Sequence, residues 1–231
     1  MKRSDVNNAI IFAKKILNQH KFLLPSFADY TPDDWLRLPA ESTSEIVSAG
    51  LGWDVTDFGF GDFKQLGLTL FTIRNHSAAN NKPYAEKIMV CQAGQVTPMH
   101  YHWNKMEDII NRGGGNLVIE LYQRDKETDL LDKTSPVTVE IDGIAHTYAA
   151  GEVVVLKPGQ SICLTPYLYH SFYPEDGADY VLAGEVSMAN DDVGDNRFLT
   201  TSDRYSAIEE NEQPMHLLCS DYSTHLAQGA H

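Results

Sequence analysis

The N-terminal segment carries apolar residues at helical spacing. Between Ser4 and Lys21 they recur on one helical face, at Val6, Ala9, Ile10, Ala13, Ile16 and Leu17. This spacing predicts an α-helix with Ser4 as its N-cap, and Pro25 helps to mark its end. We expect its apolar face to pack on the rest of the protein or on a partner subunit.

Beyond this helix the pattern changes to short apolar alternations separated by turn residues. Residues 25–45 contain three prolines and one short predicted helix that begins at Thr31. Strands are predicted at residues 66–75, 84–92 and 113–125, and again over 134–174, where Asp142-Gly143 forms a hairpin turn. Because almost no helix separates these strands, they should pair antiparallel in a closed barrel or jelly roll.

The chain shows no internal repeat and no low-complexity linker that would mark a domain boundary. A β-barrel of this length is commonly a single domain. We therefore expect an all-β protein of one domain over residues 1–231. Residues 1–45 would form a helical N-terminal extension, and the β-barrel would extend over about residues 46–222.

Composition and charge exclude several kinds of partner. Apolar residues make up 42% and charged residues 22% of the 231 positions, which is ordinary for a globular chain. The net charge of -14 disfavours nucleic acid and anionic membrane surfaces, because both would repel it. The sequence contains neither a long apolar run nor a signal-peptide core, so we expect a soluble cytoplasmic protein.

The three cysteines, Cys91, Cys163 and Cys219, are odd in number and show no C-x-x-C pairing. This arrangement predicts neither a disulfide framework nor a thiolate zinc site. Cys163 lies in the apolar run SICL, which indicates a thiol in the core. A nucleophilic Cys163 with His170 as its base is the less favoured interpretation.

The segment Gly94 to Gly114 carries the densest candidate chemistry. His100 and His102 are two positions apart, so on a strand both imidazoles point to the same face. Glu107 follows just beyond them and can return a carboxylate to that face. Two imidazoles and one carboxylate that converge in this way predict half of a divalent-metal site.

With its flanking glycines, this segment reads Gly-x5-His-x-His-x4-Glu-x6-Gly and resembles the first motif of the cupin superfamily. That resemblance implies a small antiparallel β-barrel in which a His from a second motif completes the metal site. His170, after the Pro158-Gly159 turn, is the predicted fourth ligand, although it follows that glycine by eleven residues and not by three. His146 is the competing candidate.

The predicted ligand set contains three imidazoles and one carboxylate but no thiolate. It suits Mn, Fe, Co, Ni or Zn and does not choose among them. An ion with six ligands, four of them from the protein, would keep two positions for neighbouring oxygens of one substrate.

A third segment, residues 184–199, is rich in carboxylates and amides. Together with HYHWNKMED and TPYLYHSFYPEDG, it makes the chain resemble the cupin D-lyxose isomerases, specifically the longer bacterial enzymes, from the N-terminal helix to about Tyr222. The resemblance implies a homodimeric, Mn-dependent isomerase that interconverts D-lyxose with D-xylulose and D-mannose with D-fructose. The sequence leaves open an enediol or a hydride-shift mechanism.

Aldose–ketose isomerisation needs a Lewis acid and a general base. Glu185 is the predicted base, and Glu120 is an alternative inward carboxylate. Lys105 is the predicted second participant, although it could equally form a salt bridge with Glu107 or Asp108. Distal sugar hydroxyls would be bound by Asp191, Asp195 and Arg197. Aromatic residues that could line the pocket are Tyr101, Trp103, Tyr167 and Phe172.

Two other functions use the same predicted ligands. A cupin dioxygenase would bind Fe(II), but it would prefer an apolar pocket, and the polar segment around residues 190–197 disfavours it. A non-catalytic sugar-binding cupin would need neither a metal nor a base. The presence of Lys105 and Glu185 beside the ligands therefore favours the isomerase.

Overall fold

The computed structural model describes residues 1–77, 80–189, 194–200 and 205–228. Its helices in these ranges are α1 (Arg3–Gln19), the 3-10 helix η1 (Ser26–Asp29), α2 (Pro32–Arg37), α3 (Ala40–Ser48) and α4 (Tyr222–Gln228). Its strands are β1 (Gly52–Thr56), β2 (Leu68–Arg74), β3 (Tyr84–Gln92), β4 (His100–His102), β5 (Glu107–Gly114), β6 (Leu117–Arg124), β7 (Leu131–Asp132), β8 (Val137–Ile141), β9 (Ile144–Tyr148), β10 (Val153–Leu156), β11 (Ser161–Leu164), β12 (Leu168–Pro174), β13 (Tyr180–Met188) and β14 (Asn196–Phe198).

The strands form two antiparallel sheets. One has the order β1-β2-β3-β13-β5-β11-β8-β9 and the other the order β10-β6-β12-β4-β14, with β7 paired to β6. Sequence-distant strands lie side by side, as when β13 pairs with both β3 and β5. The all-β, cupin-like class predicted from the sequence is confirmed.

The main core lies between the inner faces of the two sheets. On each strand alternate residues point inward, so that β6 contributes Ile119 and Leu121 to this core. Glu120 lies between them and faces outward, where it accepts a hydrogen bond from the Tyr122 hydroxyl at 2.8 Å. The expectation that Glu120 could be an inward carboxylate is therefore wrong, because the register assigns the inner face to its apolar neighbours.

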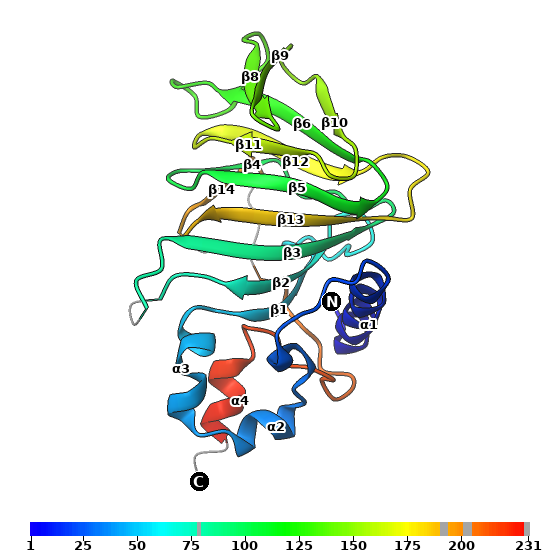
Figure 1. Ribbon diagram of the computed structural model, residues 1–231, viewed down its shortest axis with the longest axis vertical. Helices are drawn as coiled ribbons and strands as arrows, with labels where there is room; N and C mark the ends of the chain where they lie inside the picture. Colours follow the sequence, from blue (N-terminus) through cyan, green and yellow to red (C-terminus); the bar gives the residue numbers. More distant parts are fainter. Residues whose placement is uncertain (78–79, 190–193, 201–204, 229–231) are drawn as a thin grey trace.

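Helix α1 covers the outer face of β1, β2 and β3 (Figure 1). Its apolar stripe, which includes Val6 and Ile10, packs there against Trp53 and Phe71, as expected for the predicted amphipathic helix. The predicted N-cap is wrong. The helix begins after Lys2, whose backbone N–H donates to the Asp5 carboxylate at 3.1 Å.

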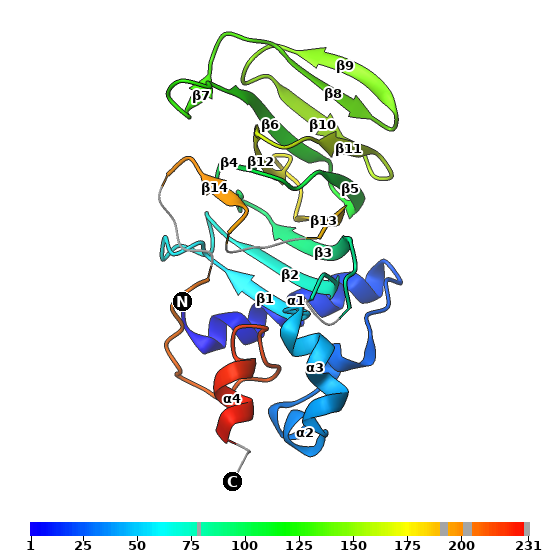
Figure 2. The same cartoon turned by 90° about the vertical axis from the view of Figure 1, so that its left-hand side faces the viewer.

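Helices α2, α3 and α4 lie together beyond β1 at one end of the molecule (Figure 2). Helix α2 begins after Thr31, whose side chain accepts from the Asp34 backbone N–H, as the TPDDW segment predicts. Helix α3 was not expected, and the predicted boundary between residues 45 and 46 falls inside it. The three helices share a small core around Trp35, Leu217 and Tyr222.

The β8–β9 hairpin confirms the turn predicted from the sequence. Asp142 and Gly143 have φ angles of 51° and 79°, the left-handed conformation that a two-residue hairpin turn requires.

Among the helices of the described ranges, none is long and apolar enough to cross a membrane.

Candidate active site and metal centre

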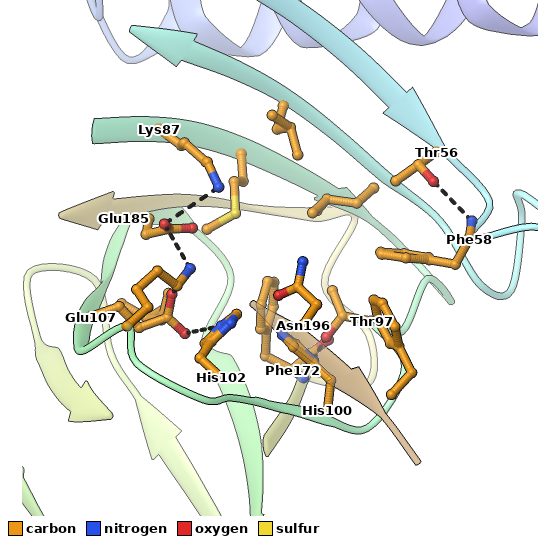
Figure 3. Close-up of a pocket in the computed structure, with 16 residues that line it drawn as sticks. Thr56, Phe58, Lys87, Thr97, His100, His102, Glu107, Phe172, Glu185 and Asn196 are labelled. Carbon is orange, nitrogen blue, oxygen red and sulfur yellow. Dashed lines mark hydrogen bonds and ion pairs between the residues drawn. The ribbon is translucent and has the colours of Figure 1, made fainter. Parts of the chain in front are cut away.

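A cavity lies between the two sheets, at the end of the main core. The free space inside it is about 60 Å³, which is room for a few water molecules. One wall is apolar and includes Phe58, Phe172 and Phe198. Polar side chains also line the cavity (Figure 3); they are Thr56, Lys87, Thr97, His100, His102, Lys105, Glu107, Glu185 and Asn196.

Strands β4 and β12 bring three imidazoles together. His100 and His102 occupy the inward positions of β4, and the register of β12 places His170 opposite His100. One ring nitrogen from each lies within 4.8 Å of the others. The i, i+2 prediction for β4 is thus correct, and His170 is the histidine that joins the pair. The competitor His146 is exposed on β9.

Each of the three imidazoles is oriented by a backbone carbonyl. Because a carbonyl only accepts, each contacted Nδ1 must carry the proton, which leaves the Nε2 lone pair for a ligand. The three Nδ1–H groups donate, over 2.8, 3.1 and 2.9 Å, to the carbonyl oxygens of Pro98, Asp195 and Leu168. The Nε2 atoms of His102 and His170 are buried and make no hydrogen bond with the described residues.

Glu107 adds the carboxylate to this cluster from the first residue of β5. Its Oε1 lies 3.3 Å from His102 Nε2 and 3.2 Å from His170 Nε2. Burial by itself would raise the pKa of Glu107, but the Lys105 ammonium and the imidazoles outweigh it and hold the pKa well below its usual range. Burial lowers the pKa of His100 and of His102, so both rings are neutral and suited to bind a cation.

The four residues fit a divalent metal ion. Two buried imidazole nitrogens have no hydrogen-bond partner among the residues that the structure describes, and a cation would satisfy both. The remaining donors are a third imidazole and an ionised carboxylate, with no thiolate. This set suits Mn, Fe, Co, Ni or Zn, as expected from the sequence.

Lys105 connects this cluster to Glu185. Its Nζ lies 2.5 Å from Glu107 Oε2 and 3.1 Å from Glu185 Oε1. The salt bridge with Glu107, which the sequence left open as an alternative, is therefore present. It does not exclude a role in catalysis, because the same buried ammonium also reaches Glu185 at the cavity wall.

Glu185 lies on the inner face of β13 and is only 5% exposed. Besides Lys105, its Oε1 accepts from Ser187 Oγ at 3.0 Å and lies 3.6 Å from Lys87 Nζ. Lys87 is a cavity residue that the sequence interpretation missed. The signal was available, because Lys87 falls on the same face of β3 as the buried Ala85 and Met89.

Of the three predicted sugar-binding residues, Asp195 and Arg197 do not line the cavity. Asp191 is outside the described residues. The Asp195 carboxylate accepts from the backbone N–H groups of Asn104 and Lys105, at 2.9 Å each, and so holds the turn before β5. Arg197 faces the outer side of β14, where its Nε donates to Asp129 at 3.1 Å. The strand alternation instead directs the neighbours of Arg197, which are Asn196 and Phe198, into the cavity.

The aromatic residues separate in the same way. Phe172 lines the cavity. Tyr101, Trp103 and Tyr167 instead contact one another with ring centroids 4.8–5.8 Å apart. Tyr101 lies between His100 and His102 on β4 and must point to the opposite face. Only one of the four aromatic residues considered therefore lines the pocket.

Cys163 is half-buried on the outer face of β11, so the expectation of a core thiol is wrong. Its neighbours Ile162 and Leu164 take the inward positions. Burial and a hydrogen bond with Asp108 raise the pKa of the thiol to about 11. A neutral thiol outside the cavity does not support a nucleophilic role.

The fold is cupin-like and is shared with solved sugar isomerases. The solved L-ribose isomerase of Cellulomonas parahominis, in complex with L-psicose, has a TM-score of 0.60 with this chain and is 13% identical, covering 90% of this chain and 98% of its own. The L-ribose isomerase of Acinetobacter sp. DL28, in complex with L-ribose, gives the same values. At this identity the likeness shows a common fold.

Sequence comparison identifies the family. The D-lyxose isomerase family matches residues 1–222. The D-lyxose/D-mannose isomerase of Serratia proteamaculans is 49% identical over 230 residues, which cover 98% of this chain and all of the relative. That of Escherichia coli O157:H7 is 49% identical over 96% of this chain and 98% of its own length. The chain belongs to the D-lyxose isomerase family and is an aldose–ketose isomerase. This membership favours the isomerase over the dioxygenase and the non-catalytic cupin.

Proposed function

We propose that this protein is a divalent-metal-dependent isomerase that interconverts D-lyxose with D-xylulose and D-mannose with D-fructose. The substrates follow those in the names of the two relatives that are 49% identical to it. The observation that carries the proposal is the position of Lys105, 2.5 Å from the predicted metal ligand Glu107 and 3.1 Å from Glu185. The Lys105 ammonium thus lies between the predicted cation site and the buried carboxylate of Glu185, at the same cavity.

The metal would be held by His100, His102, Glu107 and His170. Their support is the neutral imidazoles of His100 and His102, the ionised carboxylate of Glu107, and the Nε2 atoms of His102 and His170, which have no hydrogen-bond partner among the described residues. When bound, the ion would supply Lewis-acid stabilisation of negative charge on the sugar oxygens. Mn²⁺ is the proposed ion, from the family resemblance, and Co²⁺, Fe²⁺, Ni²⁺ and Zn²⁺ fit the same donors.

Glu185 is the proposed general base. In the aldose-to-ketose direction, its carboxylate removes the proton from C2 and returns it to C1, with an enediol between the two steps. The ammonium groups of Lys105 and Lys87 lie 3.1 and 3.6 Å from it and favour its charged form, which a base requires. Lys105 is placed to donate to a sugar oxygen as negative charge develops there.

The cavity also offers contacts for the rest of the sugar. Lys87 and Asn196 are the proposed polar contacts, because both line the cavity. The apolar wall around Phe172 would contact the C–H surface of the ring or chain. Asp195 would act indirectly, since it holds His102 through its carbonyl and Lys105 through its carboxylate. A contact from Asp191 stays a prediction.

The test is an activity assay on protein treated with EDTA and then supplied with single divalent metals. The expected result is that D-lyxose is converted to D-xylulose only after metal is restored, most strongly with Mn²⁺, and that D-mannose is also converted. Stoichiometric metal binding without conversion of either sugar would refute the proposal. Full activity in the metal-free protein would refute the metal dependence alone.

Three expectations from the sequence also stay predictions. They are one domain over residues 1–231, a homodimer, and a cytoplasmic location. Light scattering coupled to size-exclusion chromatography would measure the mass of the assembly directly. A mass of twice 25.8 kDa is the expected result.

A further inference from the structure

The two strands that form the metal side of the cavity are short, and one of them is the edge strand of its sheet. Strand β4 carries His100 and His102, and β14 carries Asn196 and Phe198. The two strands pair over three residues. Strand β4 is joined to β12 by the residue pair His100 with His170, and the Tyr167 backbone N–H just before β12 donates to the His102 carbonyl at 2.8 Å. Since β14 is the last strand of this sheet, contacts on the outer face can contribute to the position of these four side chains.

That support comes from Asp129 on the outer face of the sheet. Asp129 lies in the turn between β6 and β7, and its carboxylate accepts from three donors on three different strands. They are Tyr101 Oη of β4 at 2.8 Å, Arg124 Nη1 of β6 at 3.0 Å and Arg197 Nε of β14 at 3.1 Å. Its backbone carbonyl accepts from Tyr169 Oη of β12 at 2.8 Å.

Two of the three donors stand directly behind cavity residues. Tyr101 separates the two β4 histidines, and Arg197 separates Asn196 from Phe198, so each of these two donors shares its backbone with two inward side chains. The environment of Asp129 favours the charged carboxylate. Burial by itself would raise its pKa, but Tyr101, Arg124 and Arg197 outweigh burial and lower the pKa below its ordinary value.

The turn that carries Asp129 is itself well defined. The Asp129 backbone N–H donates to the Asp125 carbonyl at 2.9 Å, and the Asp125 carboxylate accepts from the backbone N–H groups of Glu127 and Thr128. Asp129 has a φ of 60°, a left-handed conformation that Asp and Asn tolerate better than most residues. An Asp129→Asn substitution is therefore compatible with the backbone.

We propose that Asp129 is a positioning residue that holds β4 and β14 from outside the barrel and thereby sets the geometry of the metal ligands and of the cavity wall. The inference rests on the proposed function, because it assigns a purpose to the position of His100 and His102. It also explains the place of Arg197, which acts on the site through Asp129 and β14 without facing the cavity.

The experiment compares Asp129→Asn with Asp125→Asn. Both remove one carboxylate from the same turn, but Asp125 contacts neither β4 nor β14 in the described structure. Mn²⁺ affinity is measured by calorimetric titration of EDTA-treated protein, and kcat and KM are measured with D-lyxose. Asp129→Asn is expected to weaken Mn²⁺ binding roughly 10–100-fold, as for other residues that orient metal ligands, and to raise KM. Asp125→Asn is expected to lower only thermal stability.

Wild-type metal affinity in Asp129→Asn would overturn the proposal, and so would an equal loss of affinity in Asp125→Asn. A second measurement separates this result from a failure of the proposed function. The imidazole nitrogen and proton signals of His100 and His102 are recorded by NMR in metal-free protein. They should move in Asp129→Asn and stay in place in Asp125→Asn, whether or not the wild-type protein binds Mn²⁺ or isomerises a sugar.

Discussion

The Glu185→Gln variant tests the proposed base most directly. Glutamine has nearly the same shape and can still accept from Lys105 and Ser187, which lie 3.1 and 3.0 Å from Glu185 Oε1. It cannot take a proton from carbon. General-base catalysis contributes about 10²–10⁴-fold to a rate, or about 2.7–5.4 kcal/mol of barrier. We expect kcat to fall by that factor and KM to change little.

The fold should tolerate this substitution. Breaking a buried ion pair costs roughly 3–5 kcal/mol when it leaves a charge uncompensated. Lys105 keeps Glu107 at 2.5 Å in the variant, so the cost should stay below about 3 kcal/mol. For a chain of this size that corresponds to a decrease in Tm of less than roughly 12 °C.

The assay measures kcat with D-lyxose at saturating Mn²⁺, metal content, and incorporation of deuterium from heavy water into D-xylulose. Asp108→Asn is the matched control, because it removes an exposed carboxylate from the outer face of the adjacent strand β5. Turnover and deuterium exchange near the wild-type level in folded, metal-loaded Glu185→Gln would refute its role as the base. A loss of kcat in Glu185→Gln, together with a wild-type kcat in Asp108→Asn, would support that role.

Three further predictions concern other parts of the molecule. His170→Ala should lower Mn²⁺ affinity by more than the roughly 10–100-fold expected for loss of an outer hydrogen bond, and unchanged metal content would exclude His170 as a ligand. Burial lowers the pKa of His216, which contacts Lys14 Nζ at 3.0 Å; the neutral ring should therefore stabilise the fold above about pH 6.5 and lose that contribution as pH falls through this value. In His216→Gln, the free energy of unfolding in urea should depend less on pH in this range. An unchanged slope of unfolding free energy against pH would contradict the assignment. In α1, Ile10→Ala should cost about 2–5 kcal/mol of unfolding free energy and Ile11→Ala less than about 0.5 kcal/mol, because the two side chains are 0% and 50% exposed.

Local patterns predicted the fold where local forces decide it. The alternation over residues 84–92 coincides with β3, and Asp142-Gly143 forms the predicted turn. Helix α3 was missed because its sequence, AESTSEIVS, contains Ser and Thr residues that have modest helix propensity. Its Ile46 and Val47 pack against the core around Trp35, a contact with residues distant in sequence. The start of α1 likewise depends on a remote partner, since Arg3 N–H donates to the Glu209 carbonyl at 2.9 Å.

The candidate site shows the same limit. The spacing of His100 and His102 was sufficient to place them on one face, and the two-motif resemblance led to His170. Sequence proximity to polar residues was not sufficient for Arg197, because the pairing of β14 with β4 decides which side chains face inward. Pairing opposite Tyr101 directs Arg197 outward. That register is a long-range property, and no local pattern in residues 184–199 specifies it.

Glu185, Asp195 and Phe198 contact the ligand motif directly. Glu185 holds the Lys105 ammonium, and Asp195 holds the Lys105 backbone and the His102 ring. Phe198 lies with its ring centroid 5.4 Å from that of His100. The ligands of residues 100–107 therefore do not set their own geometry. It follows that substitutions of Glu185, Asp195 or Phe198 should affect metal affinity as well as substrate affinity, although the ligands themselves come from β4, β5 and β12.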